Sequence, residues 1–235
     1  MNIISKVGSK ISTEWKEQVV NPFKVRNKQK IFCIGRNKTA TTSLRDAFVD
    51  LGFITGNESK ARYLLDDYIK KDFEPIIKFC KHAQVFKDIP FSLPDTYKYL
   101  DKAYPGSKFI LTVRDSPEQW YNSVVKFRSK LFGNGNLPTA EDLKKANFAS
   151  KGWAWKLHNE VYDTPESDIY NKKIVMNNYK NYNKEVESYF SGRNCLLKIN
   201  VSENSAYQEF CDFIEMESPF DRFPWKNKTS DIRVK

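Results

Sequence analysis

Four short apolar runs in the chain are separated by stretches with a helical pattern. The runs occupy residues 31–34, 84–86, 108–113 and 195–199 and have the length and composition of buried strands. Strands that alternate with helices favour a mostly parallel sheet that is covered by helices on both faces. We therefore expect an α/β protein with three layers, in which a central sheet lies between two layers of helices.

The segments after the first and third runs predict helices. A polar turn after residue 34 leads into an apolar stripe at Leu44, Ala47, Phe48 and Leu51. After residue 113, an N-cap serine, a proline at the first helical position and a glutamine suited to close a capping box occur in order, at Ser116, Pro117 and Gln119. The apolar face of this second helix is expected to contain Trp120, Val124, Phe127 and Leu131.

Residues 133–150 interrupt the periodic pattern. They are rich in Gly, Asn and Lys, so we expect a mobile connection or a lid there. Beyond them, apolar residues repeat at helical spacing from Val175 to Tyr189 and predict a long helix with Gly192 as its C-cap.

The composition indicates one folded domain. The chain has 235 residues, 40% of them hydrophobic, and is long enough to bury a core without disulfides or metals. No stretch approaches the roughly 20 consecutive apolar residues of a membrane span, and the first residues lack an apolar signal core. We therefore expect a soluble, cytoplasmic protein. Its four cysteines form no CxxC pair, which favours reduced, mostly buried thiols over a zinc site or a disulfide framework.

The positive charge is concentrated at the beginning of the chain. The formal net charge is +10, and residues 1–30 carry seven basic side chains against two acidic ones. We divide the chain into a basic N-terminal arm or helix at residues 1–29 and a single α/β domain at residues 30–235. This charge fits an anionic ligand, or attraction to nucleic acid or acidic lipid, whereas a solvated arm without a dedicated partner is the alternative.

The segment between the first strand and its helix has the composition of an anion-binding loop. It reads GRNKTATTSL from Gly35 to Leu44. A helix that begins beyond the carboxyl end of a parallel strand presents free N–H groups and a positive dipole to an anion. Thr41, Thr42 and Ser43 add three hydroxyls, and Lys38 adds a charge. An ordinary hydroxyl-rich N-cap is the alternative, but the combination favours a phosphate or a sulfate.

The position of the lysine distinguishes this loop from that of nucleoside triphosphatases. Their loop reads GxxxxGK[ST], with the lysine at the end of the turn. Here Lys38 comes three residues after Gly35, and Ala40 stands where a second glycine is expected. The arrangement resembles the 5′-phosphosulfate loop, GxxKTGTTSL, of sulfotransferases that use 3′-phosphoadenosine 5′-phosphosulfate (PAPS). The resemblance implies a P-loop nucleotide-binding fold and contacts to this donor from eight residues: Arg36, Asn37, Lys38, Thr39, Ala40, Thr41, Thr42 and Ser43.

Residues 108–123, KFILTVRDSPEQWYNS, resemble the 3′-phosphate motif of the same family. By this resemblance Arg114 would bind the 3′-phosphate with its fork of donors, and Ser123 would donate a hydroxyl. The usual spacing between these two residues is eight, and here it is nine, so Asn122 is the alternative to Ser123. Taken alone, Arg114 is better explained by an ion pair with Asp115 or another carboxylate at the edge of the sheet; the preceding loop reverses this preference.

Asp88 lies at the end of the second strand, in the segment FKDIP. In cytosolic sulfotransferases the matching turn carries the histidine that removes the acceptor's proton, and some branches use a carboxylate. Asp88 therefore resembles the catalytic base, and the alternative is a residue that caps the following turn. Lys87 would assist the leaving group or face solvent. His82 precedes the strand and is a poor rival base.

Two further segments add weaker support. Residues 223–229, FPWKNKT, resemble the tail that closes the nucleotide site in related sulfotransferases, with Lys226 and Lys228 near the 3′-phosphate or in solvent. Trp153 and Trp155 would stack on a sugar or aryl acceptor, although packing in the core is the better explanation for most of the aromatic residues nearby.

The resemblance implies transfer of a sulfuryl group from PAPS to an acceptor hydroxyl or amine, with adenosine 3′,5′-bisphosphate as the product. Asp88 would take the acceptor proton, and Lys38 would neutralise charge on the departing phosphate. No metal is required in principle, since a sulfuryl group carries less charge than a phosphoryl group. The acceptor remains open among a small molecule, a carbohydrate, a lipid and a peptide, and nucleic acid is not expected as a partner.

Two other functions compete with this interpretation. A small-molecule kinase that uses ATP and Mg²⁺ would bind the metal through Asp115, but it needs a lysine where Ala40 and Thr41 stand. A non-enzymatic adaptor would bind anions through the basic residues 1–30 and would not depend on Lys38.

Overall fold

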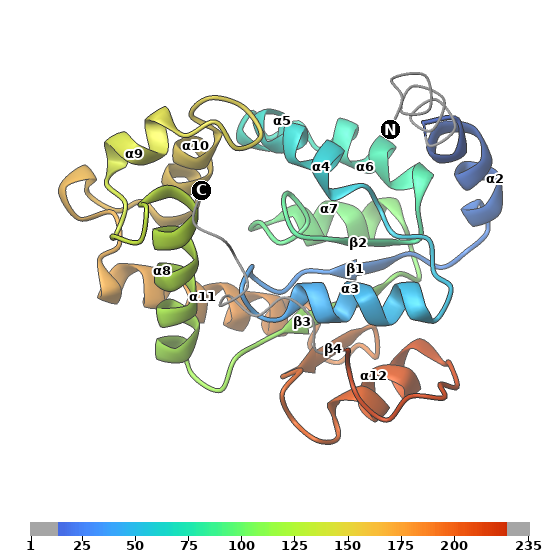
Figure 1. Ribbon diagram of the computed structural model, residues 1–235. Helices are drawn as coiled ribbons and strands as arrows, with labels where there is room; N and C mark the ends of the chain where they lie inside the picture. Colours follow the sequence, from blue (N-terminus) through green and yellow to red (C-terminus); the bar gives the residue numbers. More distant parts are fainter. Residues whose placement is uncertain (1–13, 225–235) are drawn as a thin grey trace, which may run out of the picture.

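The computed structural model describes residues 14–224 and contains a parallel sheet of four strands. The strands are β1 (Ile31–Cys33), β2 (Val85–Lys87), β3 (Lys108–Thr112) and β4 (Leu196–Ile199), in the spatial order β2-β1-β3-β4 (Figure 1). Each lies within one residue of an apolar run identified in the sequence. The expected α/β fold with a parallel central sheet is confirmed.

The register brings the ends of β1 and β2 level, and β3 continues two residues beyond them. Cys33 of β1 pairs with Lys87 of β2 on one side and with Ile110 of β3 on the other. The chain leaves β1 toward β2 and later returns to the opposite side of β1 for β3. This reversal makes the carboxyl ends of β1 and β3 a topological switch point, the place where open α/β sheets bind ligands.

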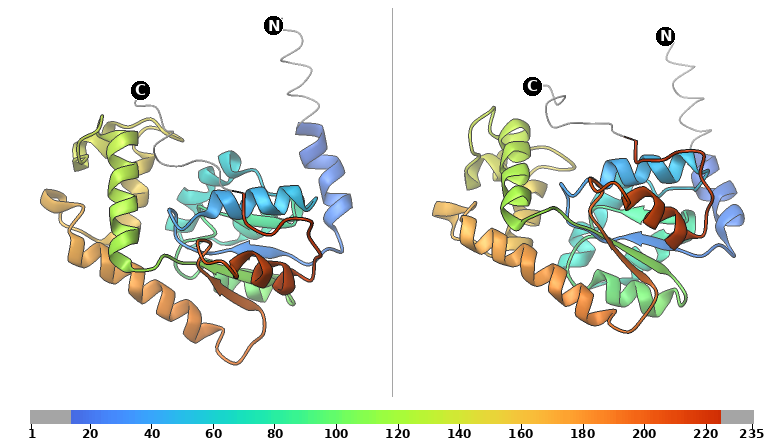
Figure 2. Two further views of the ribbon diagram at one scale, coloured as in Figure 1. Left: turned by 60° about the horizontal axis from the view of Figure 1, so that its bottom comes forward. Right: turned by 90° about the horizontal axis from the view of Figure 1, so that it is seen from below.

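Alternate residues of the strands enter two separate cores. Ile31, Cys33 and Val85 pack on one face against α3 (Thr41–Asp50) and α12 (Ala206–Ile214). Figure 2 shows these two helices side by side on that face. The opposite face carries the larger cluster, which includes Phe32, Phe86 and Phe109. Because side chains alternate across a strand, each three-residue strand contributes to both layers.

Most of the remaining helices cover the second face or extend beyond it. They are η1 (Lys16–Val20), α2 (Asn21–Val25), α4 (Glu58–Ala61), η2 (Arg62–Leu64), α5 (Leu65–Ile69), α6 (Glu74–Phe79), η3 (Cys80–His82), α7 (Thr96–Ala103), α8 (Pro117–Phe132), α9 (Ala140–Lys145), α10 (Trp153–Tyr162), η4 (Glu166–Asp168) and α11 (Lys172–Tyr189). Figures 1 and 2 show α8, α9 and α10 together beyond the carboxyl ends of the strands. We call these three helices the helical lobe.

The helical lobe contains the segment expected to be a mobile connection or lid. Residues 133–150 include α9, whose N-terminus has a capping box in which Thr139 and Asp142 exchange hydrogen bonds. A helix of six residues is too short to produce a clear periodic pattern, which explains why the sequence did not predict it. Movement of this segment remains a prediction.

The two longest helices begin and end close to the expected residues. Ser116 Oγ caps α8 by accepting a hydrogen bond from Gln119 N–H (3.0 Å), and the Gln119 side chain accepts one from Asp115 N–H (3.1 Å) instead of closing a capping box. In α11 the helix ends at Tyr189, with Phe190 as C-cap, and Gly192 follows with a φ of 77°.

The apolar face predicted for α8 is correct in part. Trp120 and Val124 are buried, but the third residue of this buried row is Arg128, not Phe127 or Leu131. Those two side chains are only half-buried and line a cavity beyond the carboxyl ends of the strands.

Part of the basic N-terminal segment packs on the domain. Glu17 forms an ion pair with Lys60 (2.7 Å) and accepts a hydrogen bond from Asn57 (2.9 Å). Asn21 and Val25 are buried. Residues 14–29 are therefore held against the α/β domain, whereas Lys6 and Lys10 lie outside the described residues.

Two further expectations concern membranes and cysteines. Among residues 14–224, we find no helix with both the length and the apolar character that crossing a bilayer requires. Cys33, Cys80 and Cys211 are buried, Cys195 is half-buried, and all four thiols are free. Mostly buried, unpaired thiols are thus confirmed, and burial raises the pKa of Cys33 to about 12.

Gly35 provides a test of the fold at the end of β1. A Cβ on this residue would lie 2.0 Å from Thr112 Oγ1 and 2.6 Å from the Thr112 nitrogen. We expect Gly35→Ala to lower the free energy of unfolding by about 2 kcal/mol or more because the backbone of β3 must shift. Urea unfolding measures this change.

Gly192→Ala is the matched control. Gly192 has a φ of 77°, and a Cβ on this residue would meet no atom within 4 Å. The alanine therefore costs only the strain of its backbone conformation, about 1 kcal/mol. An equal cost at the two positions would show that Gly35 does not approach β3 this closely.

Candidate active site

A cavity of about 1060 Å³ lies between the carboxyl ends of the strands and the helical lobe. Its wall includes residues that follow β1, β2 and β3, together with residues of α8 and α10. Most of the side chains singled out in the sequence reach it: Asn37, Lys38, Ala40, Thr41, Thr42, Ser43, Asp88, Arg114, Asn122 and Ser123.

The loop after β1 presents free hydrogen-bond donors to this cavity. Ala40 is the N-cap of α3, and the first helical hydrogen bond runs from Leu44 N–H to the Ala40 carbonyl (3.2 Å). The N–H groups of Thr41, Thr42 and Ser43 therefore have no partner within the helix. Their hydroxyls make no hydrogen bond to any other described residue. Three amides and three hydroxyls are thus available to an anion at the positive end of the helix dipole.

Contacts to β3 and α8 hold the loop in place. Thr39 Oγ1 donates to the Arg36 carbonyl (2.5 Å) and lies 2.6 Å from Thr112 Oγ1 on β3. The Arg114 side chain donates to the Lys38 carbonyl (2.8 Å), and Trp120 Nε1 donates to the Asn37 carbonyl (3.0 Å). The loop carbonyls are therefore turned toward the protein, which leaves the amides of the α3 N-terminus free for a ligand.

Lys38 faces the cavity and forms no ion pair with a carboxylate of residues 14–224. Its Nζ lies 4.2 Å from the centre of the Phe127 ring. Burial, and to a smaller extent repulsion from Arg114, lower the pKa of Lys38 to about 8, while the charge of Asp88 partly opposes the shift. A bound anion would offset both the burial of the ammonium group and its repulsion from Arg114, because its negative charge would lie beside Lys38.

Arg114 and the start of α8 form the neighbouring wall. The predicted alternative for Arg114, an ion pair with Asp115, is absent from the described structure, where Asp115 accepts hydrogen bonds from Gln119 (2.5 Å) and Asn200 instead. Asn122 and Ser123 both line the cavity, so the geometry leaves both available to a ligand. Ser123 is half-buried and Asn122 is exposed.

Two of the predicted donor contacts do not reach the cavity with their side chains. Arg36 is buried, donates to the Ser92 carbonyl (3.0 Å), and stacks over the Tyr182 ring at 4.9 Å. Thr39 is fully buried, and its hydroxyl is engaged by Arg36 and Thr112. The buried side chains of Arg36 and Thr39 hold the loop on the side away from the cavity. Only the main-chain atoms of these two residues remain as potential ligand contacts.

Asp88 lies in the cavity at the end of β2. Its carbonyl accepts a hydrogen bond from Ser92 N–H (2.9 Å), whereas its carboxylate has no hydrogen-bond donor among residues 14–224. The side chain is therefore not the cap of the following turn. The neighbouring Lys87 is 7% exposed and paired with Glu58 (3.0 Å), so it does not face solvent. His82 belongs to η3, before β2, and is not part of the cavity wall.

Aromatic side chains line the part of the cavity that the helical lobe covers. Phe132, Phe148 and Trp153 stand close together, with ring centres 5.9 Å and 5.6 Å apart in successive pairs. Trp153 is also fixed by a hydrogen bond from Nε1 to the Arg62 carbonyl (2.9 Å). Trp155 is not part of this wall. Of the two tryptophans considered in the sequence, only Trp153 can meet a ligand there.

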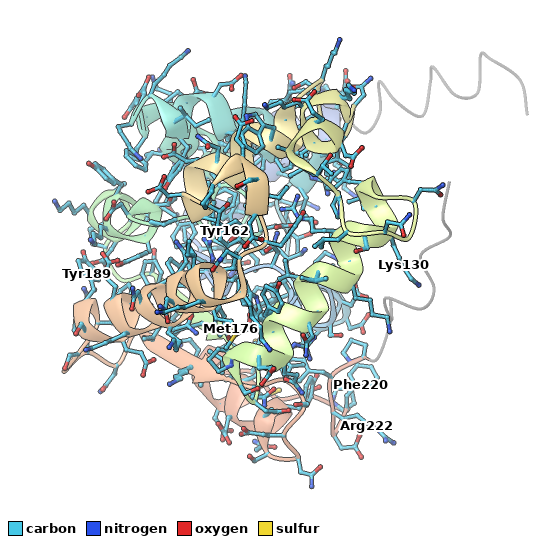
Figure 3. All side chains as sticks on the ribbon, turned by 90° about the vertical axis from the view of Figure 1, so that its left-hand side faces the viewer. Lys130, Tyr162, Met176, Tyr189, Phe220 and Arg222 are labelled. Carbon is cyan, nitrogen blue, oxygen red and sulfur yellow. The ribbon has the colours of Figure 1, made fainter. Side chains whose placement is uncertain are left out.

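The C-terminal segment closes one side of the cavity. Phe223 packs against Tyr207 and Phe210, with ring centres about 5 Å away. Figure 3 shows Phe220 and Arg222 on this segment after α12, and Arg222 lines the cavity. Lys226 and Lys228, which the sequence placed near the 3′-phosphate, lie outside the described residues.

Cations predominate in the cavity wall, and sequence reasoning missed several of them. The wall holds seven basic side chains against four acidic ones: Lys38, Arg62, Lys87, Arg114, Lys126, Arg128 and Arg222, with Glu58, Asp88, Glu203 and Asp221. Arg128 had a detectable signal, since it falls four residues after Val124 within the apolar row of α8. Arg62 belongs to a short 3₁₀ turn and had none.

Comparison with protein families identifies this arrangement. A model described as the sulfotransferase domain matches residues 30–232. The chain belongs to the sulfotransferase family. The match covers the sheet, the anion-binding loop and the helical lobe, and it confirms the resemblance found in the sequence. A search of curated proteins gives no match.

Ala40 is the one departure from the family's loop pattern. Its backbone conformation predicts that glycine at this position would make the protein more stable. Ala40 has a φ of 67°, a left-handed conformation that glycine adopts without strain. We expect Ala40→Gly to raise the free energy of unfolding by about 1 kcal/mol. Urea unfolding measures the gain.

Ala47→Gly supplies the opposite case in the same segment. Ala47 lies inside α3, where glycine is a poor helix former, so this substitution lowers stability by about 1 kcal/mol or more. A loss of stability in both variants would contradict the strain assigned to Ala40.

Proposed function

We propose that this sulfotransferase uses PAPS as its donor and transfers the sulfuryl group to a hydroxyl, or an amine, of an acceptor. One observation carries the proposal. A loop with three free amides and a lysine that forms no ion pair with a described residue faces the same cavity as a carboxylate without a hydrogen-bond donor, at the end of the adjacent strand. These are an anion site and a base within one cavity, as a transfer from an anionic donor to a hydroxyl requires.

The residues present fit such a donor. The N-terminus of α3 and Lys38 suit the 5′-phosphosulfate, since their free donors and positive charge match its oxygens. Arg114 and Ser123, or Asn122, suit the 3′-phosphate. When bound, PAPS supplies the sulfuryl group, and the protein supplies binding, orientation and charge.

The roles of the two catalytic residues follow from their surroundings. Asp88 holds an unbonded carboxylate toward the cavity and accepts the proton of the acceptor hydroxyl. Lys38, with the amides of Thr41 to Ser43, neutralises the negative charge that develops on the departing phosphate. We propose that this charge replaces a metal ion, because a sulfuryl group carries less charge than a phosphoryl group.

All four cysteines are free, as is usual in a reducing compartment. We therefore propose that the protein acts in the cytoplasm. We do not propose nucleic acid as a partner or as the acceptor.

Nucleotide binding tests the donor. We expect adenosine 3′,5′-bisphosphate, without added metal, to raise the melting temperature by about 5 °C at a concentration near 100 times its Kd. ATP with Mg²⁺ is the control and gives a much smaller shift. A larger response to ATP with Mg²⁺ would favour a kinase.

Lys38 makes nucleotide binding depend on pH. Its pKa of about 8 means that the free protein loses the ammonium charge as the pH rises through this value. The Kd for adenosine 3′,5′-bisphosphate should change little between about pH 7 and 7.5, where both phosphates are mostly ionised, and rise above about pH 8, toward about tenfold per pH unit. Titration calorimetry at several pH values measures it.

Substitutions at Lys38 separate charge from proton binding. Lys38→Arg should bind with little dependence on pH between about 7 and 9, because arginine stays protonated. Lys38→Ala should lower turnover by about 10²-fold or more, whereas Arg114→Ala should mainly raise the Kd of the nucleotide. Small, equal effects from Lys38→Ala and Arg114→Ala would count against these roles.

Asp88→Asn tests the base. Asp88 has a φ of 63°, and asparagine tolerates this left-handed conformation, so the fold should persist. We expect turnover, measured as release of adenosine 3′,5′-bisphosphate with a mixture of phenols and alcohols, to fall by about 10²-fold to 10⁴-fold. The affinity for the nucleotide should change little.

Asp95→Asn is the matched control. Asp95 has a φ of 61° and occupies the N-cap position of α7 outside the cavity wall, where its carboxylate pairs with Lys98 (2.7 Å). This variant should keep its turnover. Similar losses in Asp88→Asn and Asp95→Asn would point to a change in the fold and not to a lost base.

A further inference from the structure

A buried arginine without a counter-charge among the described residues borders the half of the cavity that the helical lobe covers. Arg128 is only 4% exposed and lines the cavity. It makes neither a hydrogen bond nor an ion pair with any residue between 14 and 224, and its guanidinium contacts the Phe132 ring at 5.4 Å. Burying an unpaired charge is unfavourable, so a buried arginine that faces an open cavity suits an anion bound there.

The groups around Arg128 do not neutralise it. Glu58, a carboxylate on the same cavity wall, is engaged by Lys87 at 3.0 Å and by Arg45 at 3.5 Å. Burial, together with the charge of Arg128, lowers the pKa of His158 to about 4, so this ring is neutral near pH 7. The positive charge of Arg128 is therefore available to a ligand.

The surroundings of this charge are apolar. Phe132, Phe148, Trp153 and Leu157 line the same part of the cavity. A second guanidinium, that of Arg62, lies 4.8 Å from the Phe148 ring and forms no ion pair with a described residue. An aromatic or aliphatic body with an anionic group matches this combination of rings and guanidinium groups better than a neutral or cationic molecule does.

Arg128 is separated from the residues assigned to the donor. It follows Ser123 by five residues in α8, which corresponds to about 7.5 Å along the helix axis. Figure 3 shows Lys130, two residues further along, near the outer end of this helix. The charge of Arg128 is thus placed beyond the start of α8, among side chains of the helical lobe.

We propose that the acceptor carries an anionic group, a carboxylate or a sulfate, on an aromatic or apolar body, and that Arg128 binds this anion while the acceptor's hydroxyl faces Asp88. The inference rests on the proposed function and specifies the substrate class of the same cavity. It assigns Arg128 to the acceptor and not to the nucleotide.

The test compares three phenols of similar size in their binding to the full-length protein saturated with adenosine 3′,5′-bisphosphate. They are 3-(4-hydroxyphenyl)propanoate, which is an anion, 4-propylphenol, which is neutral, and tyramine, which is a cation. Titration calorimetry should show the anion binding about tenfold to 100-fold more tightly than the neutral phenol. Arg128→Gln should remove this preference, and Arg128→Lys should retain part of it.

Lys126→Gln is the matched control, because it removes one positive charge from the cavity wall on the same helix. This variant should keep most of the preference for the anion. Equal losses in Lys126→Gln and Arg128→Gln would overturn the assignment, because they would show attraction by the summed charge of the cavity. A sulfate ester in place of the carboxylate distinguishes the two anionic groups.

Nucleotide binding separates the two proposals. If the wild-type protein binds adenosine 3′,5′-bisphosphate but shows no preference for the anionic phenol, only the role of Arg128 is overturned. If Arg128→Gln weakens binding of the nucleotide as strongly as Arg114→Ala does, Arg128 belongs to the donor site, and the assignment to the acceptor is also overturned. If the wild-type protein does not bind the nucleotide, the proposed donor fails, and this inference fails with it. Retained nucleotide binding by Arg128→Gln also demonstrates that the variant is folded.

Discussion

The close contact between the end of β1 and the end of β3 determines the rest of the site. Gly35 passes so near Thr112 that no side chain fits between them, and the adjoining hydroxyls of Thr39 and Thr112 meet at 2.6 Å. This contact holds the loop after β1 against the sheet at the switch point. Because β2, β1 and β3 are parallel and adjacent, their carboxyl ends lie at one edge of the sheet, and Asp88 and Arg114 reach the same cavity as Lys38. A cavity at this position follows from the strand order, and its chemistry follows from the residues that end each strand.

The cavity is organised around positive charge that the described residues do not balance. Lys38 has a lowered pKa, and Arg128 is buried without an ion pair to any residue of the described chain. Such groups make the empty protein less stable than it would be with apolar side chains at these positions. Anionic ligands restore the balance, so part of the affinity for them comes from charges that are already in place and desolvated. Aromatic side chains in the wall lower the local dielectric and so strengthen these interactions.

The sequence predicted the fold, and the part of the cavity wall formed by the loop after β1, more fully than the rest of the cavity. Buried parallel strands and amphipathic helices produce strong local patterns, and the loop from Gly35 to Leu44 is contiguous, so its residues share one environment. The part of the cavity that we assign to the acceptor is formed by α8, α10 and the segment around Arg62, which are distant in sequence and meet only through tertiary packing. The burial of Arg36 also escaped prediction, because its partners Ser92 and Asn178 are far along the chain. A charged residue within an apolar row, as at Arg128, was the available sign of a buried charge in the cavity wall.

Helix α8 borders both halves of the cavity, with Ser123 in the part assigned to the donor and Arg128 in the part assigned to the acceptor. It is capped by Ser116 and fastened to the loop after β1 through Trp120, so its position relative to that loop is fixed. If Asp88 is the base and Arg128 binds the acceptor's anion, the fixed position of α8 determines the distance between the reacting hydroxyl and the anionic group. Molecules in which this distance is too short or too long cannot satisfy Asp88 and Arg128 together. The enzyme would then select its acceptors by molecular length as well as by charge.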